Sequence, residues 1–572
     1  MSRDARSLAI VLLAWLGAYH AASLAWPPAP AWAGAIEDAI ETRIDQLING
    51  GTQSIGSSQV AAPSFLADLY GRRGFRAAWD RTERLDALLS AVEEATLDGL
   101  VPADYHVADL RRHHNALAAA GTGRRSAGEI ADADILASDA LIGLAYHLYF
   151  GKVDPIRLDS RWNFSRRLDR DDAVGAVGDA LESGKIEALI KRLRPDRVIY
   201  TDLRRALAAH RDLAARGGWP RVPIGPTLSA GARDPRVAAL RVRLALSGDI
   251  EGSTFGGTRR GGADTSQFFD PTLESAVRAF QRRHLMADDG VVGAGTVAAL
   301  NVPIGERIDQ IRLNLERGRW LLHHVPDSFI VVNVAAFEVY LVAGRQRVWT
   351  ARCQVGSQAR QTPIFRSDMR YLVFNPTWTV PSGILSRDIL PPLRRGDLSV
   401  LERKKLKVLD RHGGAVSPAS VDWSGITARN CPYTFRQDAG PDNALGRVKF
   451  MFPNSYSVYL HDTPSRDLFD APTRAFSSGC IRVDRPLELA ELLLASRKWD
   501  ASAIQRAVES GKTTTVSLPR PLPVMLLYWT AFPIQGSGLV SFAPDLYRRD
   551  APILKALDAA PGTTPLVTGK TP

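Results

Sequence analysis

The hydrophobic pattern of this 572-residue chain changes its period near residue 322. Before that point, apolar residues recur every three or four positions, which is typical of amphipathic helices. After it, β-branched and aromatic residues alternate with polar ones in short runs, which is typical of strands. A chain of this length is expected to form three or four domains. We therefore predict a multidomain α+β protein in which a helical part precedes a mostly antiparallel β domain.

The helical part begins with a predicted scaffold domain over residues 35–226. Its segment RLDALLSAVEEATLDGL (84–100) places leucines and Val92 on one face of a helix. This region contains no obvious catalytic grouping. His106 and His147 lack the spacing of metal ligands, so we expect them to be packed or exposed rather than ligating.

A second helical unit is predicted over residues 227–302. It contains AVRAFQRRH (276–284), then DG (289–290), VG (292–293) and a closing T...AL. These motifs resemble the small three-helix peptidoglycan-binding module. The alternative is an ordinary helical linker domain.

The β domain is predicted over residues 303–515, beginning with a helix near 304–321. Its strand candidates are FIVVNVAAFEVYLV, RVWTARCQV, MRYLVFN, RVKFMF and YSVYLH. Between Asn375 and Arg447, about 70 residues rich in Pro, Gly and charge interrupt the strands. Irregular stretches of that length within a domain are usually functional lids or disordered inserts. Because this one joins two core strands, we predict a lid over residues 376–446.

The N-terminus is typical of a secretory signal peptide. Arg3 and Arg6 precede a long apolar run, and Ala31-Trp32-Ala33 supplies an A-x-A cleavage signature. We predict a signal peptide over residues 1–33. The alternative is an uncleaved anchor helix, because the apolar run is long. Both interpretations export the rest of the chain.

The charge of the chain favours anionic partners. Lysine and arginine exceed the acidic residues, giving a formal net charge of +11. No basic run is interleaved with aromatics in the way that base stacking requires, so we predict no nucleic-acid partner. An exported protein meets anionic cell-wall polymer and lipid instead.

The three cysteines are Cys353, Cys431 and Cys480. Exported chains usually pair their cysteines, and an odd number leaves one thiol free. Cys353 and Cys431 are able to form a bridge, which would leave Cys480 unpaired. A free thiol in an oxidising compartment is a mild indication of function.

The surroundings of Cys480 permit nucleophilic chemistry. The segment FSSGCIRV (476–483) places it after a Ser-Ser-Gly turn, and His461 lies nineteen positions earlier, at the end of a strand candidate. A nearby histidine favours the reactive thiolate. Gly479 allows backbone N–H groups to approach a reacting carbonyl as an oxyanion hole. From residue types alone, a catalytic Cys–His pair and a structural cysteine are equally supported.

The segment HDTPSRDLFDAPTRAFSSGCIRV (461–483) resembles the signature of the L,D-transpeptidases, in which a histidine precedes a Ser/Thr-x-Gly-Cys motif. The segments RGFRAAWD, DGLVPADYH, YHLYFGKVDP and PLPVMLLYWTAFPIQGSGLVSFAPDLYRRD resemble the large, scaffold-bearing branch of that family. The resemblance implies that Cys480 is the nucleophile and His461 the base. It also implies that the amides of Gly479 and Cys480 hold the oxyanion.

The resemblance also suggests roles for other residues near the motif. Many relatives have histidine at the position of Ser478, whose part in the oxyanion hole is therefore open. Arg482, where relatives often have asparagine, is a candidate for binding a stem-peptide carboxylate or for a surface salt bridge. Tyr459 and Trp378 are candidate walls of the donor cleft, although aromatics on strands are more often core. The histidine's partner in this family is commonly a backbone carbonyl, and we expect Asp462 to be solvated.

The activity implied is acyl transfer on peptidoglycan stem peptides. The thiol attacks the carbonyl between diaminopimelate and a terminal D-alanine, and an amine from another stem resolves the thioester into a 3→3 cross-link. No metal or cofactor is implied, the location is periplasmic, and carbapenems are expected to acylate Cys480. The alternatives are a carboxypeptidase or hydrolase using the same thioester, and a non-catalytic wall-binding scaffold. The acceptor, any cell-wall synthesis partners and the oligomeric state stay open.

The remaining residues, 516–572, are expected to pack on the scaffold and catalytic domains.

Overall fold

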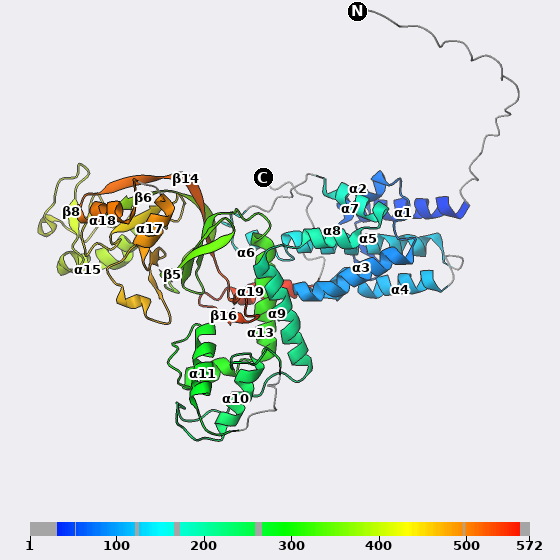
Figure 1. The fold of residues 1–572 in the computed structure, drawn as a ribbon. Helices are drawn as coiled ribbons and strands as arrows, with labels where there is room; N and C mark the ends of the chain where they lie inside the picture. Colours follow the sequence, from blue (N-terminus) through cyan, green and yellow to red (C-terminus); the bar gives the residue numbers. More distant parts are fainter. Residues whose placement is uncertain are drawn as a thin grey trace, which may run out of the picture.

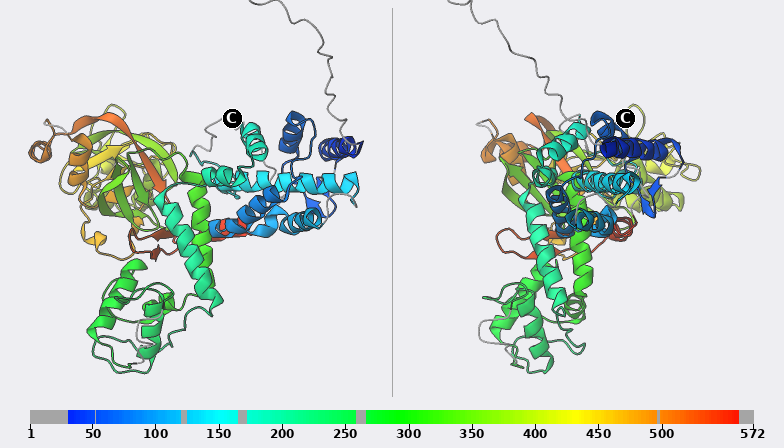
Figure 2. Two further views of the ribbon diagram at one scale, coloured as in Figure 1. Left: turned by 45° about the vertical axis from the view of Figure 1, so that its right-hand side comes forward. Right: turned by 90° about the vertical axis from the view of Figure 1, so that its right-hand side faces the viewer.

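The computed structural model describes residues 31–51, 53–119, 125–164, 172–257, 266–495 and 498–560. Figures 1 and 2 show three lobes around a pair of long helices, α9 (Val198–Ala215) and α13 (Ile304–Leu321). A helical lobe lies on one side of the pair, a β-rich lobe on the other, and a small helical lobe beyond one end. Each lobe has its own cluster of buried apolar side chains. The multidomain α+β prediction is confirmed.

The large helical lobe is built around α5 (Ala127–Phe150), whose side chains are buried on nearly all sides. A helix that is apolar all round is stable only inside a core. Its buried carboxylates, Asp134 and Asp139, accept hydrogen bonds from backbone N–H groups of neighbouring loops. The surrounding elements are α1 (Ala31–Asn49), β1 (Ser54–Ile55), β2 (Ser58–Gln59), α2 (Pro63–Arg72), α3 (Thr82–Glu94), η1 (Ala95–Asp98), η2 (Pro102–Tyr105), α4 (Val107–Ala118), α6 (Pro155–Leu158), α7 (Ala173–Ser183) and α8 (Ile186–Leu193).

His106 and His147, the two histidines considered from the sequence, make packing contacts. His106 Nε2 lies 2.9 Å from Asp139, and His147 Nδ1 lies 3.0 Å from the Tyr105 hydroxyl. Burial lowers the pKa of His147 to about 3, so its ring stays neutral. Both side chains therefore belong to the polar interior of the lobe.

Helix α13 joins the helical lobe to the β-rich lobe. Its buried Glu316 accepts hydrogen bonds from the Val153 N–H and the Trp320 indole, and it pairs with Arg319. Arg319 in turn donates to the carbonyl of Asp98. A buried charge is stable only when it is paired and hydrogen-bonded, and this network meets that condition.

The small lobe contains three helices, α10 (Arg236–Leu246), α11 (Pro271–Arg283) and α12 (Ala294–Leu300), as predicted. Its Arg283 pairs with buried Asp249 at 2.6 Å and donates to the carbonyl of Val540 at 2.8 Å. The lobe is therefore attached to the C-terminal part of the chain as well as to its sequence neighbours.

The β-rich lobe contains a nine-stranded sheet in the order β12-β5-β13-β11-β10-β6-β14-β3-β4. Because β4 also pairs with β5, the sheet closes on itself. Most pairs are antiparallel, but β11–β13, β12–β5 and β14–β3 are parallel. The strands are β3 (Phe329–Asn333), β4 (Glu338–Ala343), β5 (Gln346–Gly356), β6 (Phe365–Phe374), β10 (Val448–Met451), β11 (Leu460–His461), β12 (Ala475–Ser477), β13 (Ile481–Val483) and β14 (Thr514–Leu527).

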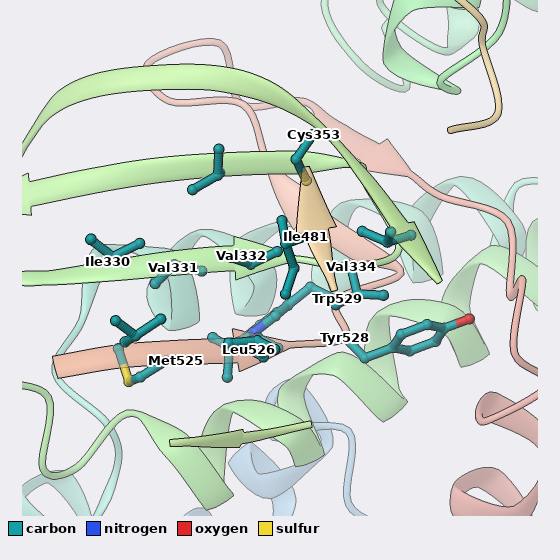
Figure 3. Close-up of a cluster of buried hydrophobic side chains, with 14 of the residues drawn as sticks. Ile330, Val331, Val332, Val334, Cys353, Ile481, Met525, Leu526, Tyr528 and Trp529 are labelled. Atoms are coloured by element: carbon teal, nitrogen blue, oxygen red, sulfur yellow. The ribbon is translucent and has the colours of Figure 1, made fainter. Parts of the chain in front are cut away.

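Figure 3 shows part of the core of this lobe, where Cys353 lies among the apolar side chains of β3, β13 and β14. Helices α17 (Pro486–Leu494) and α18 (Ala501–Glu509) complete the lobe. Trp499, just before α18, stacks on Phe374 with ring centroids 5.6 Å apart. All three cysteines are free, so the bridge between Cys353 and Cys431 is absent.

Residues 376–446 connect β6 to β10, which are antiparallel neighbours. The stretch is not irregular throughout, because it has an apolar core of its own that includes Ile389, Leu393 and Phe435. The sequence pattern did not reveal this folded unit, because its elements are short and are separated by prolines and glycines. Its elements are β7 (Trp378–Thr379), α14 (Ser382–Ile384), η3 (Leu385–Ile389), α15 (Leu390–Arg394), α16 (Ser399–Arg403), β8 (Lys407–Leu409), η4 (Pro418–Ser420) and β9 (Thr434–Gln437). We call this unit the insert.

The C-terminal part of the chain is divided between two lobes. Strand β14 runs through the expected boundary at residue 515, because its pairing with β6 and β3 extends to Leu527. The elements that follow are β15 (Ala531–Pro533), β16 (Val540–Phe542) and α19 (Asp550–Leu557). Asp558 pairs with Arg312 of α13, and the carbonyl of Leu557 accepts from Lys152 of the helical lobe.

The expected signal peptide lies almost wholly outside the described residues, which begin at the start of α1. Among the described helices, none is both long and apolar enough to cross a membrane.

Candidate active site

Strand register brings one row of polar side chains together across the sheet. Lys449 of β10 pairs with His461 of β11, which pairs with Arg482 of β13, which pairs with Gln354 of β5. Directly paired residues point to the same face of a sheet, and their strand neighbours point to the other. The other face carries Phe450, Leu460 and Ile481, which are fully buried. One face of these strands is thus core, and the other carries titratable groups.

His461 is buried and held in one orientation. Its Nδ1 bonds to the backbone carbonyl of Asp462. A carbonyl only accepts, so Nδ1 carries the hydrogen and Nε2 keeps a free lone pair. Burial lowers the pKa of His461 to about 3, and the positive charge of Arg482 adds to the effect. The ring is therefore a neutral base at physiological pH.

Cys480 is half-buried at the start of β13, on the face that carries His461. Its Sγ lies 3.7 Å from the carbonyl oxygen of Ser457. Burial raises the pKa of the Cys480 thiol, opposed by hydrogen bonds from Tyr459 and by the charges of Lys449 and Arg482. The resting group is therefore a thiol, which needs a base before it can attack a carbonyl.

Tyr459 contacts both members of the pair. Its ring centroid lies 5.6 Å from that of His461, and Cys480 adds to the rise that burial causes in the pKa of its hydroxyl. Trp378, on β7 of the insert, lies close enough to the same hydroxyl to oppose that rise. Both aromatic residues nominated from the sequence therefore lie at the site, and Trp378 connects it to the insert.

The turn before Cys480 differs from the expectation in one respect. Gly479 has a φ of +117°, which L side chains rarely adopt, and its N–H donates to Ser477 Oγ at 3.0 Å. Ser477 Oγ donates in turn to the Cys480 carbonyl at 2.5 Å. The Gly479 amide is therefore engaged inside the turn, whereas the Cys480 amide makes no such bond there. Of the two expected oxyanion donors, Gly479 is thus the one whose N–H is used within the turn. Ser478 is exposed, and its hydroxyl accepts from Arg360.

Arg482 does not form the surface salt bridge considered above. Its Nη1 donates to Gln354 at 3.1 Å, and within the described residues it pairs with no carboxylate. Its buried Nε has no partner. A desolvated cation without a counterion is a candidate for binding an anion.

Lys449 is a site residue that sequence reasoning missed. Its Nζ lies 3.9 Å from the centre of the Tyr459 ring, and burial lowers its pKa. No ion pair with a described carboxylate accompanies it. The available signal was a lysine inside the otherwise apolar strand run RVKFMF. Asp462, expected to be solvated, is only 2% exposed, because its carboxylate accepts from the Arg447 N–H and pairs with Arg466.

Comparisons with known proteins identify the three lobes. Residues 327–516 match the L,D-transpeptidase catalytic domain family, residues 64–207 the scaffold domain family, and residues 233–300 the family described as "Putative peptidoglycan binding domain". A curated protein of Haemophilus influenzae, "Putative L,D-transpeptidase", is 35% identical over 246 residues. That alignment covers 43% of this chain and 48% of the relative, so the chain spans about half the length of that protein.

Two solved structures were also matched, each over 53% of this chain. The L,D-transpeptidase of Xylanimonas cellulosilytica (residues 123–326) has 16% identity and a TM-score of 0.17, with 99% of it covered. A fused Zn-dependent amidase/peptidase/peptidoglycan-binding protein of Clostridium acetobutylicum has 12% identity and a TM-score of 0.15, with 100% covered. At these TM-scores neither structure carries an argument about this chain.

The matched segments are of the kind found in cell-wall enzymes, and such domains indicate an extracytoplasmic location. More specifically, the chain is similar to L,D-transpeptidases, because one segment matches their catalytic domain and others match a scaffold domain and a peptidoglycan-binding domain.

Proposed function

We propose that this protein forms 3→3 cross-links in peptidoglycan through a thioester on Cys480. The observation that carries the proposal is the parallel pairing of β11 with β13. That pairing sets a neutral histidine with a free Nε2 on the same face as a half-buried thiol, with Tyr459 in contact with both. A positioned base next to a thiol is the arrangement that cysteine acyl transfer requires.

The proposed reaction has two acyl transfers. The Cys480 thiol gives its proton to His461 Nε2 as its sulfur bonds to the carbonyl between diaminopimelate and the terminal D-alanine. The C–N bond then breaks, and the proton passes from His461 to the amine of the departing D-alanine. An amine of a second stem attacks the thioester, gives a proton to His461, and displaces Cys480, which recovers its proton. The Cys480 N–H is the proposed donor to each tetrahedral oxyanion.

The cations of the site are proposed to hold the donor stem. A tetrapeptide ending in D-alanine carries carboxylates close to the scissile bond. Lys449 and Arg482 supply desolvated positive charge on the same sheet face as the nucleophile. A carboxylate bound there would gain a charge-assisted hydrogen bond and would also offset part of the positive charge of the two cations. Tyr459 and Trp378 are the proposed walls of this donor site.

The insert is proposed to act as a cover that keeps water from the thioester. It reaches the site at two points, where Trp378 lies near the Tyr459 hydroxyl and where Asp388 pairs with Arg360 beside Ser478. Exclusion of water is what separates transfer to an amine from hydrolysis. The proposed location of the reaction is the periplasm, reached by means of the N-terminal signal peptide.

The test is the reaction of purified protein with wall material that bears tetrapeptide stems, followed by mass spectrometry of the muropeptides. We expect 3→3 dimers and free D-alanine, and neither product with Cys480→Ala. Tripeptide stems without dimers would indicate the carboxypeptidase alternative instead. Wall binding without any product would indicate the non-catalytic scaffold.

A further inference from the structure

Two residues of the segment that follows β5 hydrogen-bond the turn that carries the nucleophile. Arg360 Nη1 donates to Ser478 Oγ at 2.9 Å, and Thr362 Oγ1 donates to the Gly479 carbonyl at 2.9 Å. The tight fit of this segment is clear at Gly356, where a Cβ would lie 2.1 Å from the Arg360 carbonyl oxygen. The turn therefore rests on the segment 360–362, which we call the cradle.

On one side the cradle is attached to the insert. The Arg360 guanidinium binds both carboxylate oxygens of Asp388 in η3, at 2.7 and 2.6 Å. Such bidentate pairs are both strong and directional, because two parallel bonds fix the plane of the guanidinium. The pair is partly buried, with 27% and 30% of the two side chains exposed. The same Nη1 that binds Asp388 also holds Ser478, so one side chain joins the insert to the turn.

On the other side the cradle is attached to the C-terminal part of the chain. The Thr362 N–H donates to the Tyr547 hydroxyl at 3.2 Å, and that hydroxyl donates to the Gly356 carbonyl at 2.6 Å. Gln361 Oε1 accepts from Arg549 at 3.1 Å. These bonds hold the cradle itself in place, so Arg360 and Thr362 contact the turn from a fixed segment.

We propose that Arg360 is a positioning residue for acyl transfer: paired with Asp388, it fixes the turn so that the Cys480 N–H points at the developing oxyanion. The inference rests on the proposed acyl-transfer function. It adds that the insert contributes to the chemical step through Arg360, beyond any covering of the thioester. An oxyanion donor is effective only when its direction is set before the reaction, so loss of this anchor lowers the rate of acylation.

The test compares two reactions of the same thiol. Acylation of Cys480 by a carbapenem passes through a tetrahedral oxyanion, whereas alkylation by iodoacetamide does not. Arg360→Ala and Asp388→Ala are expected to slow acylation by about 10- to 100-fold and to leave alkylation within about twofold. Both rates are measured by intact-mass spectrometry on the full chain, and circular dichroism and thermal unfolding confirm the fold.

Additional variants distinguish a positioning role of Arg360 from a general loss of structure. Arg360→Lys should rescue poorly, because an ammonium cannot reproduce the bidentate geometry. The double variant should acylate no more slowly than Arg360→Ala, because Asp388 acts through Arg360. The matched control is Arg403→Ala, which breaks an exposed pair with Asp397 elsewhere in the insert and should leave both rates unchanged.

The outcomes distinguish this inference from the proposed function. A wild-type protein whose Cys480 alkylates but is never acylated would overturn the acyl-transfer proposal itself. Normal acylation in Arg360→Ala would overturn the positioning role alone. Equal slowing of acylation and alkylation would also overturn it, because the variant would then have altered the thiol rather than the oxyanion donor.

Discussion

Two cysteines of one sheet have opposite surroundings. Cys353 on β5 is paired with Val483 of β13, only three residues after Cys480, yet Cys353 lies in the apolar core shown in Figure 3. Burial holds the pKa of the Cys353 thiol far above its usual range. Cys480 is on the other face, against Tyr459 and near two cations. The face of the strand, and not the residue type, decides which thiol can react.

The two faces also differ in what they contribute to the stability of the fold. The core face gains stability by burying apolar surface, at roughly 25 cal/mol per Å². The reactive face buries a histidine and two cations with no described carboxylate to neutralise them, which costs stability unless a ligand supplies the charge. Most of the following predictions change one face and leave the other intact, and the last one removes the insert instead.

The largest expected effect is on turnover. Cys480→Ala should abolish cross-linking, a loss of at least about 10³-fold, because no other group can form the thioester. Cys353→Ala should retain turnover within about twofold and lose about 1 kcal/mol of stability, because it leaves a small void in a packed core. Muropeptide analysis and denaturant unfolding provide the two readouts. A Cys353→Ala protein that folds but does not turn over would remove the distinction between the faces.

His461→Ala should lower turnover by about 100-fold at neutral pH, because the thiol is then unassisted. The remaining rate should rise with pH as more thiolate forms, since the thiol pKa is raised. The wild-type protein should keep its activity well below pH 6.5, because the pKa of His461 is about 3 and the ring stays neutral. Acylation rates over the pH range check both statements. An acid limb near 6.5 in the wild type would contradict the buried, neutral histidine.

These expectations show what the sequence could predict. The motif around Cys480 and His461 identified the nucleophile and base candidates, and alternating runs identified the strands, because side-chain period and residue chemistry are local properties. Lys449 was missed and the solvation of Asp462 was wrong, because both depend on which strands are neighbours. Strand register is a tertiary property that a single sequence does not carry.

The insert shows the same limit in another form. Its length and composition suggested a lid, but its core is made of residues such as Leu393 and Phe435, which are separated by short turns. Arg360 likewise had no local signal, because its partners Asp388 and Ser478 are 28 and 118 positions away. Contacts at such separations are fixed by packing rather than by local pattern.

The third prediction concerns the stability that the protein loses at low pH because His461 is buried on the reactive face. An unfolded histidine has a pKa near 6.5, and that of folded His461 is about 3, so stability is lost as pH falls below 6.5. Between pH 7.5 and 5 the loss from this group is roughly 2 kcal/mol, about 30-fold in the opening equilibrium. His461→Gln should remove that part of the loss, as measured by hydrogen exchange of the β11 and β13 amides. The exposed His412→Gln control should change nothing, and an identical loss in His461→Gln would contradict the prediction.

The fourth prediction concerns the cations. Lys449→Met should raise the KM for a tetrapeptide donor by about 10-fold, with a smaller change in kcat, because it removes charge that binds a carboxylate in ground and transition state alike. Lys407→Met is the matched control, since Lys407 is an exposed lysine of the insert that pairs with Asp438. A fall in kcat at unchanged KM would instead indicate that Lys449 stabilises the Cys480 thiolate.

The smallest expected effect tests the cover. The Asn375 N–H donates to the Arg447 carbonyl at 2.8 Å, so a short Gly/Ser turn can replace the insert without moving β6 or β10. A thioester exposed to water hydrolyses unless the site is shielded or the amine is held close. We expect released tripeptide to rise about threefold relative to cross-linked dimer, while iodoacetamide still alkylates Cys480. Because excision also removes Asp388, the product ratio and not the acylation rate is the readout. The ratio of tripeptide to dimer in Asp388→Ala serves as the baseline. If the shortened protein folds and keeps this baseline ratio, the insert contributes to acylation but does not shield the thioester.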